Sequence, residues 1–103
     1  MARYLMEVLS RALEGRDAEY AAWYLDTHIG EVCELDGIDS GQLHHRLDAE
    51  GKPTGEFVAH YMVETDDPAG LLQRLFAAAA TMKLTDTIDM ASTRFSFLTP
   101  VKA

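Results

Sequence analysis

The chain has 103 residues, 48% of them hydrophobic, and carries a formal net charge of −8 at pH 7. This length predicts a single domain covering residues 1–103, and the apolar content argues against a disordered chain. The acidic balance disfavours nucleic acid and anionic membranes as partners. The one continuous apolar run, "LFAAAATM", is too short to span a bilayer. A lone cysteine, Cys33, rules out an intrachain disulfide and favours a cytoplasmic protein.

The first element, "RYLMEVLS" at residues 3–10, has two possible interpretations. Alternation places Tyr4 and Met6 on one face of a strand, but Leu5 and Leu9 also recur at a helical spacing. Periodicity alone does not decide between them. The opening segment also lacks the apolar core that a signal peptide needs.

A helix is predicted from residue 18 to residue 35. Asp17 is its expected N-cap, because a carboxylate there can accept from the first free backbone N–H groups. Gly37 supplies the stop, since glycine adopts the left-handed conformation that often follows a helix. Gly30 lies inside the helix and predicts a bend just after His28.

The second half of the chain reads as a hairpin, a helix and a final strand. "IDSGQLHHRLD" and "GEFVAHYMVET" are predicted strands around the turn-rich "AEGKPTG". Asp67 is the expected N-cap of the next helix, with Pro68 at its first position. The final strand, "ASTRFSFLTPV", ends at Pro100. The buried stripe of the second helix is predicted to be Leu71, Leu72, Leu75, Phe76, Ala79 and Met82.

The element order β-α-β-β-α-β predicts an α+β, ferredoxin-like fold. In that fold a four-stranded antiparallel sheet carries two helices on one face. The strand at residues 57–63 has apolar side chains at both parities, so the other face of the sheet also needs a cover. An identical sheet in a two-fold homodimer is the simplest one.

The segment "EGRDAEYAAWYLDTHIGEVCELDGI" resembles the EthD-like branch of the dimeric α+β barrel families. It has their glycine–arginine–acid turn, a helix with a "WY" pair, and a histidine near the helix end. "HYMVETDDPAGLL" and "MASTRFSFLTPV" are similar to the second half of that branch. The chain departs from the pattern after the histidine, where Gly30 follows Ile29 in place of the usual proline. The resemblance implies a homodimer with a small-molecule cavity between sheet and helices, and relatives that include polyketide cyclases, lactone isomerases, cofactor-free oxygenases and haem-handling enzymes.

The first helix carries the main catalytic candidate, His28. Its position ends a mostly aromatic stripe at helical spacing. His28 is either a core histidine with a backbone partner or an acid/base facing a pocket, for which imidazole has a suitable pKa. With the family likeness, we predict the catalytic role. The stripe consists of Tyr20, Trp23, Tyr24, Thr27 and His28.

His60 is the second catalytic candidate, because a histidine in an apolar strand needs a polar partner. That partner could be a substrate, a tyrosine hydroxyl or the dimer mate. His44 and His45 are adjacent in a strand and face opposite ways, so they cannot chelate one metal together without a β-bulge. The predicted substrate-binding residues are Tyr4, Tyr20, Trp23, Tyr24, His45 and Tyr61.

No metal site or cofactor is predicted. The sequence has no H-x-x-x-H, no H-E-x-x-H and no glycine-rich phosphate loop. Cys33 follows His28 by five residues, an offset that turns it away on a helix and disfavours a Cys–His pair. We therefore predict a cofactor-independent isomerase, cyclase or lyase that acts on a cyclic or aromatic small molecule in an apolar pocket between the sheet and the first helix. A non-catalytic small-molecule-binding or accessory protein is the alternative, and a haem-binding oxygenase-like protein is a further one.

Overall fold

The computed structural model describes residues 2–102 and alternates strands and helices in the predicted order. The third element of that order, η1, is a short π-helix that joins α1 to α2, so these three form one helical segment. The elements are β1 (Arg3–Ala12), α1 (Asp17–Trp23), η1 (Tyr24–His28), α2 (Ile29–Cys33), β2 (Ile38–Leu47), β3 (Pro53–Glu64), α3 (Pro68–Ala79) and β4 (Ile88–Leu98).

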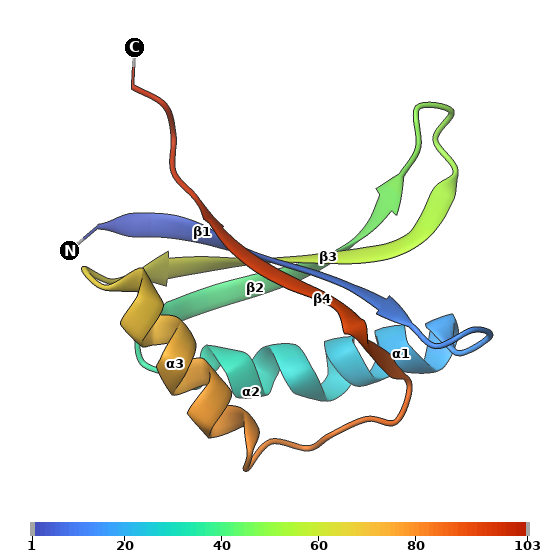
Figure 1. Ribbon diagram of the computed structural model, residues 1–103, viewed down its shortest axis with the longest axis horizontal. Coiled ribbons are helices and arrows are strands. Elements are labelled where there is room, and N and C mark those ends of the chain that lie inside the picture. Colours follow the sequence, from blue (N-terminus) through green and yellow to red (C-terminus); the bar gives the residue numbers. More distant parts are fainter. Residues whose placement is uncertain (1, 103) are drawn as a thin grey trace.

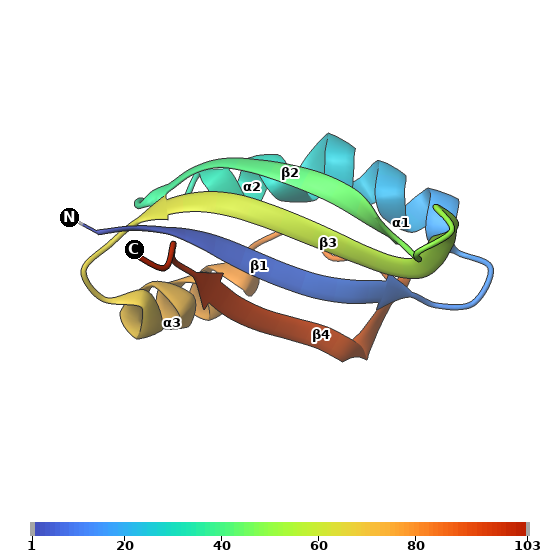
Figure 2. The ribbon, with the colours of Figure 1, turned by 90° about the horizontal axis from the view of Figure 1, so that it is seen from above.

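The four strands form one antiparallel sheet in the order β2-β3-β1-β4. Figure 2 shows the strands lying side by side in this order. In Figure 1 all the helices lie on the same side of the sheet, below the strands. The predicted ferredoxin-like α+β fold is therefore confirmed. Within residues 2–102, no helix is long and apolar enough to cross a membrane.

The segment at residues 3–10, which can be a strand or a helix by sequence, is part of the strand β1. Its apolar side chains alternate between the two faces of the sheet. Met6 lies opposite Tyr61 of β3 and Phe97 of β4, so these three side chains share the face beneath which the helices pack. Met6 and Tyr61 are almost fully buried there. A helix would have divided these positions between its faces, whereas the strand places Tyr4, Met6, Val8 and Ser10 together against the core.

The two helix starts differ in how they are capped. At α3 the prediction is confirmed: the Asp67 carboxylate accepts from the backbone N–H of Gly70 at 3.0 Å, and Pro68 is the first helical residue. At α1 the prediction is wrong by one residue, because Arg16 is the N-cap and Asp17 is already helical. The carboxylate of Asp17 makes no capping bond but lies in the first turn, where the helix dipole favours negative charge.

The helix is irregular before His28 and not just after it, where Gly30 predicts a bend. Tyr24–His28 forms a π-helical turn, and Gly30 sits in the regular α2 that follows. π-Helical turns are wider than α-turns and occur often at functional sites. The wide turn here carries His28 as its last residue.

The outer face of the sheet, which no helix covers, is partly apolar. Met62 and Leu98 are 40% and 43% exposed on it, next to Leu5 of β1, which pairs with both. Val58 on the same face is buried by its neighbours. The predicted burial of Phe76 in α3 is wrong: its side chain is 52% exposed because it lies at the rim of a cavity.

Candidate functional site

A cavity of about 460 Å³ lies between the inner face of the sheet and the helices. Its walls come from α1, η1, α2, α3, the strands β1, β3 and β4, and the segment 82–85 that leads from α3 toward β4. This volume is in the range of small-molecule sites. Six aromatic side chains line it: Tyr20, Trp23, Tyr24, Tyr61, Phe76 and Phe95.

His28 is on the wall of this cavity, held between two aromatic rings. Its imidazole stacks on the Trp23 indole, with centroids 4.4 Å apart and planes at 19°. It meets Tyr24 edge to face at 4.9 Å. Its Nδ1 is buried without a hydrogen-bond partner among residues 2–102. Burial lowers the pKa of His28 below the usual 6.5, although Glu31 partly opposes this. The ring is therefore neutral at pH 7.

Trp23 and Glu31 also hold the segment that closes one side of the cavity. The indole Nε1 donates to the backbone carbonyl of Lys83 at 3.1 Å, and the Glu31 carboxylate accepts from the backbone N–H of Lys83 at 3.1 Å. The helical segment that carries His28 thus bonds both the backbone N–H and the backbone carbonyl of Lys83. Leu84 next to it is 81% exposed and lines the cavity mouth.

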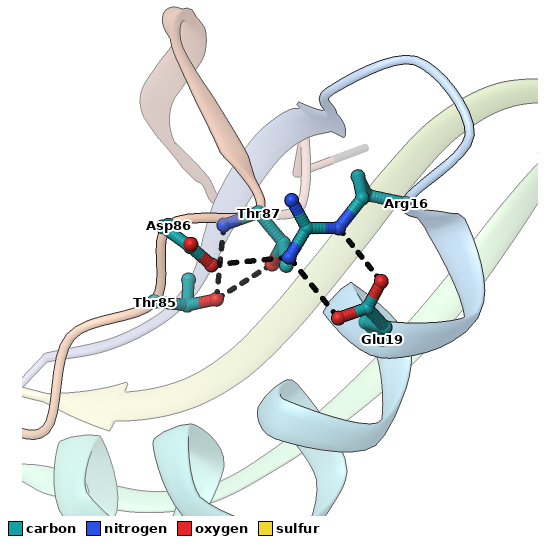
Figure 3. A network of polar contacts seen from close by, with 5 residues as sticks. All are labelled: Arg16, Glu19, Thr85, Asp86 and Thr87. Atoms are coloured by element: carbon teal, nitrogen blue, oxygen red, sulfur yellow. Dashed lines mark hydrogen bonds and ion pairs between the residues drawn. The ribbon is translucent and has the colours of Figure 1, made fainter.

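A polar network fixes the far end of the same segment (Figure 3). The Arg16 guanidinium bonds the Glu19 carboxylate at 2.7 Å and reaches Asp86 at 3.2 Å. Its hydrogen bond holds the pKa of Glu19 below the ordinary value. The hydroxyls of Thr85 and Thr87 are 2.6 Å apart beside this pair. The network joins the start of α1 to the approach to β4.

Some polar atoms at the cavity are paired within the protein. The hydroxyls of Ser10 and Tyr20 lie 2.6 Å apart, and both side chains are almost fully buried. Burial raises the pKa of Tyr20, and the bond to Ser10 opposes that rise. This pair ties β1 to α1 at the floor of the cavity.

Three buried polar side-chain atoms have no partner among the described residues, and all three belong to residues that line the cavity. They are Nδ1 of His28, the hydroxyl of Tyr61 and Oγ1 of Thr93. Burial raises the pKa of both Tyr61 and its neighbour Tyr24, so both phenols are protonated at pH 7. Unpaired buried polar atoms are rare in folded proteins, and their grouping at one cavity calls for an explanation.

The structure brings five of the predicted site residues together. Tyr20, Trp23, Tyr24, His28 and Tyr61 all line the cavity. Thr27, which an ideal α-helix would place on the same stripe, does not line it. The wide π-turn alters the phase of the helix between these positions.

Three predicted site residues lie elsewhere. Tyr4 is on the inner face of β1 but packs edge to face on Phe97, with centroids 6.2 Å apart, and does not reach the cavity. His45 is exposed near the end of β2 and contacts the Phe57 ring at 5.1 Å. His60, the second catalytic candidate, is on the outer face of the sheet, away from the cavity.

The polar partner that His60 was expected to need is Glu7. The His60 Nε2 and the Glu7 carboxylate are 2.8 Å apart, on neighbouring strands. His44 shares this face, with its ring centroid 5.1 Å from that of His60, while its Nδ1 contacts the Val58 carbonyl. Across residues 2–102, no three His, Cys, Asp or Glu side chains gather as a metal ion would require.

Sequence reasoning missed the cavity residues that come from the α3–β4 connection and from β4. Lys83, Leu84 and Thr85 line the cavity from the connection, and Met90 and Thr93 line it from the strand. An irregularity in the pairing of β1 with β4 shifts the alternation of β4 in this region, so positions three apart face the cavity together. No motif in the sequence marks this shift.

The fold and the cavity define a ferredoxin-like α+β protein with an internal small-molecule-sized site. No protein-family model matches the chain, and no curated protein is similar to it in sequence. Solved structures nevertheless share the fold. An antibiotic biosynthesis monooxygenase-type protein from Bordetella bronchiseptica has a TM-score of 0.64 at 12% identity, covering 99% of this chain and 100% of its own.

Two further structures agree with this fold. A protein of the ethyl tert-butyl ether D (EthD) family from Bacillus halodurans has a TM-score of 0.60 at 6% identity, covering 95% of this chain and 99% of its own. A NIPSNAP domain protein from Burkholderia xenovorans has a TM-score of 0.58 at 17% identity, covering 95% and 94%. The resemblance inferred from the sequence is thus confirmed at the level of the ferredoxin-like fold, which an EthD family protein shares.

Proposed function

We propose that the chain is a cytoplasmic, cofactor-independent acid/base enzyme of the EthD-like group. It acts on a cyclic or aromatic small molecule by isomerisation, cyclisation or lyase cleavage. The observation that carries the proposal is a neutral imidazole, His28, on the wall of a cavity lined by six aromatic rings. The fold shared with an EthD family protein and a monooxygenase-type protein supports a small-molecule site.

The surroundings of His28 suit a base better than an acid. Burial favours the neutral ring, so one ring nitrogen can accept a proton at pH 7. The stacked Trp23 and the perpendicular Tyr24 fix the ring plane, which keeps the acceptor in one direction. No carboxylate is among the described residues of the cavity wall, so nothing there competes with the imidazole for the proton.

The test is proton abstraction itself, which needs no knowledge of the product. A panel of cyclic ketones, enones and lactones is incubated with the protein in D₂O, and loss of α-protons is followed by NMR. We expect exchange with at least one compound, and a fall of about 10²-fold or more in its rate on His28→Asn. His60→Asn is the matched control, because His60 is a histidine outside the cavity. Its rate should stay within a few-fold of wild type.

Two results would count against the enzyme. If His28→Asn exchanges protons as fast as the wild type while its circular dichroism is unchanged, His28 is not the base. If compounds bind and raise the melting temperature but none exchanges, the non-catalytic binding protein is the correct alternative.

We also propose that the outer face of the sheet pairs two copies of the chain in a two-fold homodimer. Leu5, Met62 and Leu98 form an apolar strip there that is partly exposed in one protomer. The Glu7–His60 pair beside the strip neutralises its own charge when His60 is protonated, which suits burial against an identical surface. The family likeness supports the same arrangement.

Sedimentation equilibrium tests the dimer. The wild type is expected at twice the mass of one chain, and Met62→Lys is expected to give the mass of one chain, because a lysine at the strip would be buried against its symmetry mate. Leu84→Lys is the control, since Leu84 is exposed on the helical side. A monomeric wild type, or a dimeric Met62→Lys variant, would contradict the proposal.

A further inference from the structure

The unpartnered hydroxyls of Tyr61 and Thr93 set the chemistry of the ligand. We infer that they are ligand-binding groups, and that the ligand is an uncharged, mostly apolar ring compound with hydroxyl or carbonyl oxygens on opposite sides. This inference rests on the proposed small-molecule site and adds two residues and a substrate class to it.

The first argument is energetic. A buried hydroxyl without a partner destabilises the folded state by about as much as a lost hydrogen bond, so it persists where something else requires it. Tyr61 is 1% exposed, and its ring packs closely on Gly41, which fixes where the hydroxyl lies. The chain pairs Ser10 with Tyr20 at the same cavity. The Tyr61 hydroxyl lies beside the Tyr24 phenol, with which it interacts without forming a hydrogen bond of good geometry, and the Thr93 hydroxyl has no partner among the described residues.

The second argument is the placement of the two groups. Tyr61 is on β3 and Thr93 is on β4, and β1 runs between these strands. Strand axes two positions apart are separated by about 10 Å. The two hydroxyls therefore reach the cavity from different strands, and a ring system with an oxygen at each side can contact both. The Thr93 hydroxyl can turn toward a ligand by rotation between staggered χ1 positions.

The third argument concerns charge. The described cavity wall carries no carboxylate, and its one fully charged side chain, Lys83, is exposed at the mouth. A buried ion in the aromatic interior would lack a counter-charge, so a neutral ligand is favoured. Neutral oxygens can pair with the two hydroxyls and with His28 without this penalty.

The experiment compares three compounds of one shape: naphthalene, 2-naphthol and 2,6-dihydroxynaphthalene. Binding is read from quenching of Trp23, the single tryptophan, which lines the cavity. In the wild type, affinity should rise with each hydroxyl. Tyr61→Phe and Thr93→Val, which remove only the polar atom, should each weaken binding of the diol by about twofold to tenfold and leave naphthalene within twofold.

Thermal unfolding without ligand supplies the second readout. Removing an unpaired buried hydroxyl should raise the melting temperature by up to several degrees in each variant. Tyr20→Phe is the matched control: its hydroxyl is bonded to Ser10, so this variant should melt at a lower temperature. A role that is only structural predicts a lower melting temperature for Tyr61→Phe as well.

The outcomes separate this inference from the proposed function. Equal weakening of all three compounds, a diol that binds no better than naphthalene, or a lower melting temperature in Tyr61→Phe would each overturn the inference alone. A higher melting temperature with unchanged diol affinity would also overturn it and would indicate hydroxyls that hold buried water only. Failure of all three compounds to quench Trp23 would contradict the aromatic-binding cavity and this inference together.

Discussion

The Ser10–Tyr20 pair allows a sharp test of how this fold is held together. Its two hydroxyls, 2.6 Å apart, are the link between β1 and α1 beneath the cavity, and both side chains are at most 2% exposed. Ser10→Ala leaves the phenol unpaired, and Tyr20→Phe leaves the serine unpaired. Each change should lower the free energy of unfolding by about 1–3 kcal/mol. The double variant removes both polar groups and should lose less than the sum of the two.

The assay is a double-mutant cycle on urea and thermal unfolding, followed by far-ultraviolet circular dichroism at one fixed protein concentration. For a domain of this size, about 1 kcal/mol corresponds to a shift of roughly 4–8 °C in melting temperature, which is easily measured. We expect a coupling free energy of about 1 kcal/mol or more. Simply additive losses in the free energy of unfolding would show that the two hydroxyls do not bond to each other.

Three further predictions follow from single contacts. A Cβ at Gly41 would lie 2.6 Å from the Tyr61 ring, so Gly41→Ala should lower the free energy of unfolding by about 1–3 kcal/mol, and an unchanged urea midpoint would contradict this close packing. Because burial lowers the pKa of His28, the unfolded chain binds its proton first as the pH falls below 6.5. Stability should therefore decline from pH 7 downward until the folded ring also protonates, and His28→Gln should flatten this part of the pH profile; an unchanged profile would argue against a buried neutral ring. Asp67→Ala should lower the free energy of unfolding by about 1 kcal/mol through loss of the α3 cap, whereas Asp67→Asn should retain most of it.

The sequence predicted the fold well because its signals are local and repeated. Alternation in β1 and β3, the Asp67–Pro68 helix start and the turn-rich hairpin each identify an element on their own. Their order then leaves few topologies to choose from. Only the sheet decides whether residues 3–10 form a strand or a helix. Pairing of β1 with both β3 and β4 stabilises a strand at Met6 and Val8.

The site could be predicted only in part, for physical reasons that the residues make clear. The aromatic members of the α1–η1 stripe depend on helical phase, which a sequence shows. The positions of Thr93 and Met90 at the cavity depend on a register shift in the pairing of β4 with β1. No residue type in the sequence indicates this shift. The sequence places His60 in an apolar strand with no polar neighbour, and that pattern predicts a catalytic role. Its partner, Glu7, is 53 residues away in sequence but directly opposite it on the neighbouring strand β1.

The π-turn at Tyr24–His28 has a consequence for how this chain tolerates change in length. A π-turn contains one more residue than an α-helix of the same rise. Removing Leu25, which is exposed, would therefore let the backbone close into a regular α-helix. Because the π-turn absorbs the extra residue, the helix on either side would keep nearly the same rotational phase after the closure. The stacked Trp23 and His28 rings would still lie on one helical face, and the indole would keep its bond to the Lys83 carbonyl. A deletion in the regular helix on either side has no such reserve, because it would rotate the two sides relative to each other by about 100° and separate the residues that form the cavity wall.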